Sequence, residues 1–297
     1  NSVSGVAHFA AKDEAGAFEI TRTLLSYLPS NNREGPPYKK SNDDPHRMEE
    51  KLNSIVPTDP SESYNVDEII NLVFDKGSYF PVHKQFAPNV SVGFARLHGR
   101  TVAVIANQPL HLAGVLDIDA SDKIARFIRF SDAFNIPLVT FVDTPGFMPG
   151  VKQEHGGIIR HGAKIVYAYS EATVPKLAVI TRKAYGGAYI VMSSKYIRTD
   201  MVFAWPTAEV AVMGAEGAIE ILYAKKFKAM ENPEDEQRKV LREFKKKFSK
   251  PYHVAASGHV DEILIPAETR PRLISALELL RNKEASLPSK KHGNIPL

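Results

Sequence analysis

The sequence contains no cysteine, which excludes disulfides, thiolate nucleophiles and thiolate metal sites. It also lacks an apolar run long enough to span a membrane and shows no N-terminal signal pattern. The net charge is only +4, and Lys and Arg are mixed with Asp and Glu, which is not typical of a nucleic-acid-binding surface. We therefore expect a cytoplasmic enzyme with no nucleic-acid partner and no direct membrane span.

Familiar catalytic motifs are absent as well. We find no Gly-x-Ser-x-Gly elbow, Walker loop, His-Glu-x-x-His or Gly-x-Gly-x-x-Gly. His155 and His161 lie six residues apart near a Gly-Gly pair, but no carboxylate pattern completes a metal triad. Surface or structural roles are favoured for them, and we predict no metal site.

The chain alternates between strand-like and helix-like patterns after a long polar stretch. Residues 30–60 are rich in Pro, Asn, Asp and Ser, and they exceed the usual length of a loop within a domain, so we place a domain boundary there. Apolar periodicity predicts helices at 13–28, 66–74, 121–134, 158–170, 214–222 and 270–280. Strands are expected at 89–97, 100–107, 137–142, 177–181, 201–204 and 209–212. This alternation predicts an α/β fold with largely parallel pairing, in which ligands bind at the carboxyl ends of the strands.

Residues 224–250 are highly charged and carry a few apolar positions. We interpret them as a solvated helix pair with one buried stripe, formed by Phe227, Val240, Leu241, Phe244 and Phe248. A basic, phosphate-binding face is the alternative.

The segment 182–189, Arg-Lys-Ala-Tyr-Gly-Gly-Ala-Tyr, predicts a strand–turn–helix corner. The first turn of a helix has N–H groups without intrahelical partners, and the missing side chains at 186 and 187 let a ligand oxygen approach them. These are the requirements of an oxyanion hole. The alternative is that the glycines only permit a tight turn.

Three further glycine-rich loops come after predicted strands or open a helix, at 113–117, 143–150 and 153–158. Four such loops in one α/β domain indicate a site built from main-chain donors, with little proton transfer by side chains. Enolate stabilisation next to a thioester is a chemistry with that demand, because charge collects on one oxygen.

Seven motifs stand in the order found in biotin-dependent acyl-CoA carboxyltransferases: residues 107–109, 113–117, 141–147, 157–163, 182–189, 205–209 and 212–215. Over nearly its whole length the chain resembles the C-terminal half of the propionyl-CoA or acetyl-CoA carboxylase β subunit. The resemblance implies a crotonase-like (ClpP/crotonase) spiral of ββα units. It also implies that residues 1–35 are the end of an upstream N-terminal carboxyltransferase domain, and that residues 36–297 are the C-terminal, biotin-side domain.

The resemblance implies transfer of a carboxyl group from carboxybiotin to the α-carbon of propionyl-CoA or acetyl-CoA, with the cofactor itself as the base. Gly187 and Ala188 match the oxyanion hole for the biotin ureido oxygen, and Gly114 matches a second donor. Gly146 and Phe147 match a loop of the biotin pocket, to which we add Gly157 and Tyr189. Ile190 stands where propionyl-preferring relatives commonly have Asp, so the acyl preference stays open between acetyl, propionyl and longer chains.

The expected cofactor is biotin, carried on a partner protein or domain, and the expected substrate is an acyl-CoA. The expected partners are copies of the same chain in a hexamer, a biotin carboxylase and a biotin carboxyl carrier subunit. Helix 158–169 would then face a partner, or else fill the core of its own domain. Two alternatives remain: a methylmalonyl-CoA decarboxylase subunit that runs the reaction in reverse, and a non-catalytic fragment that only binds biotin and assembles.

Overall fold

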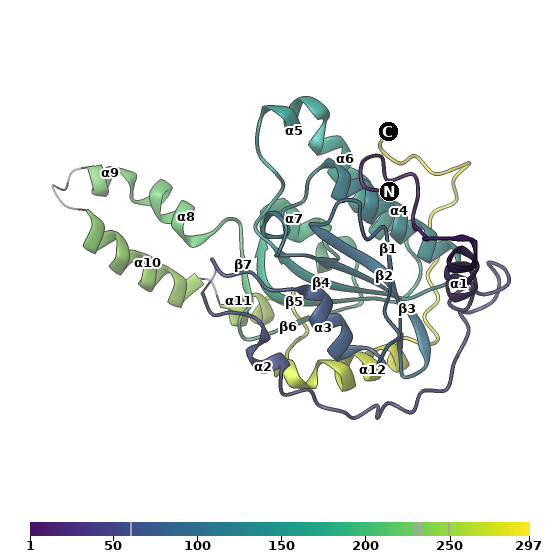
Figure 1. Cartoon of the computed structure of the whole chain (residues 1–297). Coiled ribbons are helices and arrows are strands. Elements are labelled where there is room, and N and C mark those ends of the chain that lie inside the picture. The colour runs from purple at the N-terminus through teal and green to yellow at the C-terminus, as the bar shows by residue number, and fades with distance from the viewer. Residues whose placement is uncertain (60, 229, 231–232, 249) are drawn as a thin grey trace.

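The centre of the molecule is a mixed sheet in the order β1-β2-β3-β4-β5-β6-β8, seen in the computed structural model of Figure 1. Its strands are β1 (Phe80–Val82), β2 (Val90–Leu97), β3 (Arg100–Asn107), β4 (Leu138–Thr144), β5 (Lys176–Tyr185), β6 (Met201–Ala204), β7 (Glu209–Ala211) and β8 (Glu262–Ile263). Pairing is antiparallel from β1 to β3 and parallel from β3 to β8, and β7 pairs with the last residues of β5. The structure describes residues 1–59, 61–228, 230, 233–248 and 250–297.

Helices cover both faces of this sheet. They are α1 (Glu14–Leu25), α2 (Leu52–Ile55), α3 (Val66–Val73), α4 (Ile118–Ala133), α5 (Val151–Gly156), α6 (Ile158–Glu171), α7 (Gly186–Val191), α8 (Ala215–Leu222), α9 (Ala224–Lys228), α10 (Glu234–Phe248), α11 (Pro251–Ala256) and α12 (Thr269–Leu279). Short 3₁₀ turns occur at Leu112–Gly114, Lys195–Ile197 and Pro266–Glu268. Within the described residues, every helix is too short or too polar to traverse a lipid bilayer.

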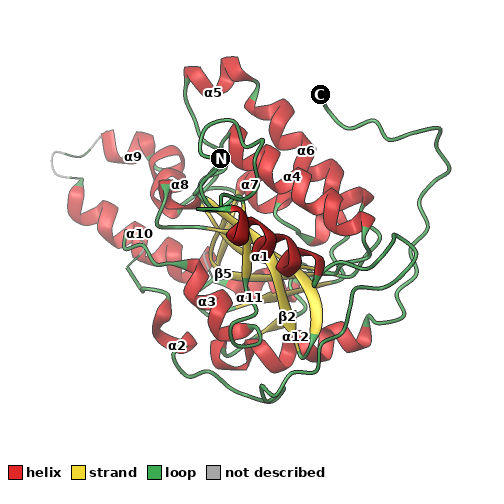
Figure 2. Ribbon diagram, turned by 45° about the vertical axis from the view of Figure 1, so that its right-hand side comes forward, coloured by secondary structure: helices red, strands yellow, loops and turns green. Residues whose placement is uncertain are grey.

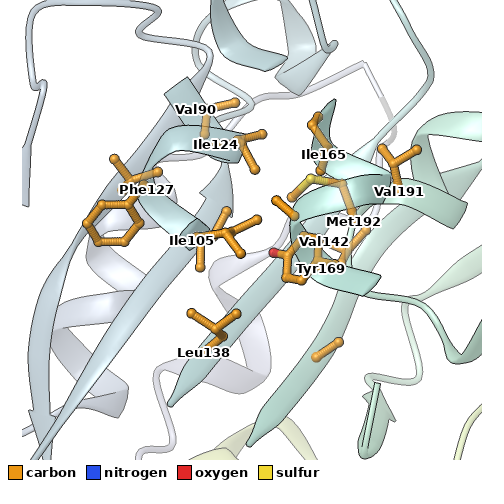
Figure 3. Packing of buried hydrophobic residues seen from close by; sticks show 14 of the residues in the cluster. Val90, Ile105, Ile124, Phe127, Leu138, Val142, Ile165, Tyr169, Val191 and Met192 are labelled. Carbon is orange, nitrogen blue, oxygen red and sulfur yellow. The ribbon is translucent and has the colours of Figure 1, made fainter. Parts of the chain in front are cut away.

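Two apolar cores lie on opposite sides of the sheet. The core beneath α4 and α6 includes Ile105, Ile124 and Ile165, which Figure 3 shows interdigitating. The other core lies beneath α3 and α12 and includes Phe74 and Trp205. All seven residues of β4 are buried, because this strand has a core on each face. The sheet is therefore held rigidly from both sides at the strand ends that carry the site.

The helices α8, α9 and α10 form an arm that projects from the body of the molecule (Figures 1 and 2). The arm has a small core of its own, made by Ile219, Phe227 and Val240, against which Leu241 and Phe244 pack. The predicted helix pair with one buried stripe is confirmed for these positions. The side chain of Phe248, the remaining predicted member, lies outside the described residues.

The predicted α/β alternation is confirmed, and each predicted helix and strand is present within a few residues. Two strands run further than expected. We ended the third and fourth predicted strands at Val142 and Thr181, but β4 continues to Thr144 and β5 to Tyr185. Pairing with β7 accounts for the extension of β5, because a strand that comes much later in the chain supplies the ladder partners.

The prediction of a loop at 153–158 is wrong for its first four residues, which belong to α5. Gly150 turns the chain into this short helix with a φ of +118°, and Gly157 ends it in the left-handed region with a φ of +84°. Both glycines therefore act as helix boundaries. The long polar stretch at 30–60 likewise contains α2 and a bridge from Tyr38 to Arg100.

The N-terminal segment is anchored to the antiparallel edge of the sheet. The hydroxyl of Tyr27 donates to the carbonyl of Ser78 at 2.6 Å, and the guanidinium of Arg96 lies 4.7 Å from the centre of the Tyr27 ring. Arg96 also donates to the carbonyl of Ser26 at 2.7 Å. These contacts fix the end of α1 on β2.

A buried charge cluster joins α12 to the end of the sheet at which β2 turns into β3. Arg270 is fully buried and donates to the carboxylate of Asp75 at 2.7 Å and to the carbonyl of Val73 at 3.0 Å. Asp75 also accepts from the N–H groups of His98 and Gly99, which form the β2–β3 turn. Arg270 thereby connects α12, α3 and the β2–β3 hairpin.

Candidate active site

The predicted strand–turn–helix corner is present at the carboxyl end of β5. Tyr185 is extended, and Gly186 turns the chain with a φ of +56° into α7. A β-carbon at Gly186 would lie 2.9 Å from the carbonyl oxygen of Val212, so a side chain there would be obstructed as well as strained. Gly187 differs, since its φ is not positive and a β-carbon would meet only the ring of Phe147, at 3.8 Å.

The corner presents main-chain donors. Gly187 and Ala188 are the second and third residues of α7, so their N–H groups have no acceptor within the helix. In the part of the chain that the structure describes, no capping or turn hydrogen bond uses either group. The far side of α7 is anchored, because Val191 and Met192 pack against α6 in the core (Figure 3). Two free donors are thus held in a fixed direction.

In the loop after β3, unlike at the corner, the N–H group of the predicted donor is already hydrogen-bonded. Gly114 has a φ of +74°, and a β-carbon there would lie 2.5 Å from the carbonyl oxygen of Asp143. Its N–H donates to the carbonyl of His111 at 3.0 Å. The structure therefore does not support the predicted donor role of the Gly114 N–H, because a hydrogen bond inside the loop already uses it. Gly114 instead permits the close approach of two site loops.

Leu112 and Ala113 were not among the predicted site residues. They have φ values of 50° and 52°, which side chains other than glycine adopt only where the surroundings hold them. No hydrogen bond to a protein acceptor is made by the N–H of either residue within the described chain. Leucine and alanine rarely adopt a positive φ, so the sequence does not predict this backbone conformation, and it is seen only in the structure.

The loop 143–150 brings Phe147 against the corner. Leu116 donates to the carbonyl of Gly146 at 3.1 Å, and Met148 donates back to the carbonyl of Leu116 at 2.8 Å, so this loop pairs with the segment after β3. The ring of Phe147 lies so close to Gly162 of α6 that a β-carbon there would be 2.7 Å away. The predicted residues Gly146, Phe147 and Gly187 are therefore brought together.

The remaining predicted residues, Tyr189, Ile190 and Gly157, occupy three different environments. Tyr189 is buried, and among the described residues its hydroxyl has no hydrogen-bond partner. Burial raises the pKa of this hydroxyl to about 12. Ile190 is 39% exposed on the outer side of α7. Gly157 lies at the junction of α5 and α6, where a β-carbon would lie 3.1 Å from the guanidinium of Arg160. Within the described residues, no hydrogen bond joins Gly157 to the corner.

Beneath the corner lies a buried ion pair that was not predicted from the sequence. Nε of Arg182 donates to Oδ2 of Asp143 at 3.0 Å, and both side chains are buried. Burial raises the pKa of Asp143, and the charge of Arg182 opposes that shift. Beside it, burial lowers the pKa of Lys183, and the neighbouring Arg182 adds to the effect. The hydroxyl of Tyr185 donates to the carboxylate of Glu209 at the same strand end.

The two histidines have the structural and surface positions that we favoured. Nδ1 of His161 lies 2.9 Å from a carboxylate oxygen of Asp122, which also accepts from Lys164 at 2.7 Å, so this cluster ties α4 to α6. His155 is exposed on α5. Among the described residues, no group of three or more His, Asp and Glu side chains is arranged to hold a metal ion.

Comparison with known proteins identifies the family of this chain. The model of the carboxyl transferase domain matches residues 1–295. The chain belongs to the carboxyl transferase domain family. It is 54% identical over 296 residues to the propionyl-CoA carboxylase carboxyltransferase subunit of Haloferax mediterranei, covering 100% of this chain and 57% of that protein. It is 49% identical over 297 residues to methylmalonyl-CoA decarboxylase subunit alpha of Propionigenium modestum, with coverage of 100% and 57%.

The same relationship holds among solved structures. A crystal structure of transcarboxylase 12S, described as a hexamer with methylmalonyl-coenzyme A and methylmalonic acid bound, matches with a TM-score of 0.95 and 48% identity. The match covers 100% of this chain and 57% of that one. It confirms the predicted crotonase-like α/β fold for this member of the carboxyl transferase family. The chain thus spans a little over half the length of these relatives.

Proposed function

We propose that this chain is the carboxyltransferase component of a biotin-dependent acyl-CoA carboxylase. It would transfer a carboxyl group from carboxybiotin to the α-carbon of propionyl-CoA or acetyl-CoA. The observation that carries the proposal is the pair of free N–H groups at Gly187 and Ala188, in a chain that matches the carboxyl transferase family from end to end. The proposed enzyme is cytoplasmic.

The residues at the corner suit biotin. A ureido oxygen is a single acceptor that takes two N–H donors, and Gly187 leaves those donors accessible. The ring of Phe147 adds an apolar wall beside them. Biotin, when bound, supplies the carboxyl group and the base that removes the α-proton. Gly187 and Ala188 would hold its ureido oxygen, and Gly146, Phe147, Gly157 and Tyr189 would line its pocket.

The strained segment after β3 supports a second donor site. Leu112 and Ala113 present free N–H groups in the loop that pairs with Gly146. We assign the donor role predicted for Gly114 to these two residues, with Gly114 shaping their loop. Ile190, partly exposed next to the donors, would contact the acyl chain and set its preference.

The other half of the enzyme lies in regions that this chain does not include. We propose that residues 1–35 end an upstream N-terminal domain that grips the acyl-CoA, and that residues 36–297 form the biotin-side domain. The length of the relatives supports a further region in the whole protein, since each relative exceeds the matched region. A hexamer that works with a biotin carboxylase and a biotin carboxyl carrier would complete the system, and the hexameric transcarboxylase 12S supports that assembly.

A decarboxylase role is the second candidate, and the 49% identity to a methylmalonyl-CoA decarboxylase subunit favours it. The test is a carboxyl-transfer assay on the complete subunit, with chemically carboxylated biotin as the donor and propionyl-CoA as the acceptor, and then capture of its native partners. Transfer together with a co-purifying biotin carboxylase supports the carboxylase, whereas a membrane-bound decarboxylase partner supports the reverse reaction. Biotin binding and assembly without transfer would show a non-catalytic role.

A further inference from the structure

Three buried polar side chains lie at the ends of neighbouring parallel strands beneath the candidate site. Asn107 ends β3, Asp143 is the sixth residue of β4, and Arg182 lies in β5. All three are buried, with exposed fractions of 0%, 1% and 6%. Polar groups so deep in a protein require partners, and the partners found here include one another and the loop after β3.

Hydrogen bonds link these side chains in series. Nδ2 of Asn107 donates to the carbonyl of Gly114 at 3.1 Å, and Oδ1 of Asn107 accepts from the N–H of Asp143 at 3.3 Å. The carboxylate of Asp143 then accepts from Nε of Arg182 and from the N–H of Lys183, each at 3.0 Å. The series therefore runs from the strained loop after β3 to the strand that ends in the corner.

The link at Lys183 coincides with an irregularity in the sheet. Along the β4–β5 pair, Val142 is opposite Ile180 but Thr144 is opposite Ala184. One residue of β4 therefore faces three residues of β5, which is a bulge. Bulges bend a strand and change the direction of the residues after the bend. Within this bulge the Asp143 carboxylate accepts the N–H of Lys183, so a side chain stands in for the missing ladder partner.

Stability alone does not explain an ion pair at this position. A buried pair is often no more stabilising than apolar side chains of similar volume, because both charges lose their hydration. Arg182 also contacts a segment that is distant in the sequence. It donates to the carbonyl of Glu62 at 2.8 Å, and its guanidinium lies 5.1 Å from the centre of the Tyr64 ring. Such contacts fix the direction of its guanidinium toward Asp143.

We propose that Asp143 is a positioning residue, which spans the β5 bulge and thereby sets the direction of the Gly187 and Ala188 N–H groups. Arg182 and Asn107 hold the Asp143 carboxylate and backbone in place and tie them to the 112–114 loop. This inference rests on the proposed carboxyltransferase function. It adds that the two main-chain donor sites are held in mutual register by one buried series of side chains.

The test uses two uncharged double variants of the complete subunit. Asp143→Asn with Arg182→Met keeps an oxygen that accepts the Lys183 N–H, whereas Asp143→Leu with Arg182→Met removes it. Because a misplacement of about 1 Å can cost about 100-fold in rate, we expect kcat to fall about 100-fold in the Leu pair and less than about tenfold in the Asn pair. KM for the acyl-CoA should stay within about threefold in both.

Equal kcat in two folded double variants would overturn the inference. If the Leu pair does not fold, Asn107→Ser provides the second test, because it leaves the ion pair intact and releases the carbonyl of Gly114. A fall in kcat of about tenfold at an unchanged melting temperature supports the proposal, and an unchanged kcat contradicts it. A wild-type subunit that transfers no carboxyl group would contradict the proposed function instead.

Discussion

The ring of Phe147 lies beside the α-carbon of Gly187, so that a β-carbon at Gly187 would stand 3.8 Å from Cε2 of that ring. This relationship joins the loop after β4 to the corner after β5. It places an aromatic ring beside the first turn of α7, which carries the Gly187 and Ala188 N–H groups. We expect a ligand with one acceptor oxygen and a flat apolar body to match this ring and these donors.

Gly187→Ala tests whether a ligand approaches the main chain at this point. The position has a helical backbone, and the new methyl group would contact only Phe147, so we expect the free energy of unfolding to stay constant or rise by about 0.5–1 kcal/mol. The methyl group would nevertheless obstruct the donors, and turnover should fall on the order of 100-fold. Urea unfolding and the carboxyl-transfer assay measure the two effects.

Gly114→Ala is the contrasting variant. Its β-carbon would collide with the Asp143 carbonyl at a φ of +74°, so it should lose stability as well as activity. Normal turnover in Gly187→Ala would show that ligands do not approach the main chain at the corner.

Ala188→Pro removes one donor directly. Proline is tolerated in the first turn of a helix, and this N–H makes no turn or capping hydrogen bond within the described chain. We expect an intact fold, judged by circular dichroism and melting temperature, with turnover of the complete subunit reduced about 100-fold. A variant with near-normal turnover would show that the Ala188 N–H is not an essential donor.

Arg270→Met should destabilise the fold strongly. The substitution leaves the carboxylate of Asp75 buried without its charge partner, which typically costs about 3–5 kcal/mol. Arg272→Met is the matched control on the same helix, because the Arg272 side chain is 48% exposed and its ion pairs contribute at most about 1 kcal/mol. Urea unfolding of both variants checks the difference, and equal losses would refute a special role for the buried cluster.

Stability should fall as the pH drops from about 6.5 to about 4. Burial lowers the pKa of His83 to about 4, and its neighbours His8, Lys123 and Arg126 add to the shift. The ring of His8 stacks on that of His83 at 4.0 Å. In this window the unfolded chain binds a proton that the folded chain does not, so acid favours unfolding.

His83→Asn should flatten this part of the stability profile, and asparagine suits the left-handed backbone at this position, whose φ is 53°. His155→Asn, at an exposed position, is the control and should leave the slope unchanged. An unaltered slope in His83→Asn would assign the acid sensitivity to other groups.

Local patterns in the sequence were sufficient for much of the fold. A continuous apolar run located β4, apolar periodicity located α6, and the glycine pair at 186–187 located the corner, because each of these signals lies within or next to one element. Boundaries that depend on distant partners were missed. The end of β5 needs β7, and α5 is bounded by glycines whose φ values appear only in the structure.

The same limit applies to the arrangement of the candidate site. Gly187 and Ala188 stand in a contiguous motif, whereas Asp143 and Arg182 are 39 residues apart and their pairing depends on the β4–β5 register. The hydrogen bond from the Gly114 N–H to the carbonyl of His111 is likewise indicated by no sequence pattern.

A crystal structure of the complete subunit with a biotinyl peptide tests the central claim most directly. We predict that the ureido oxygen lies about 2.7–3.2 Å from the nitrogens of both Gly187 and Ala188, with the ring of Phe147 against the bicyclic body. Ordered biotin bound elsewhere, with these two N–H groups facing only water, would contradict it.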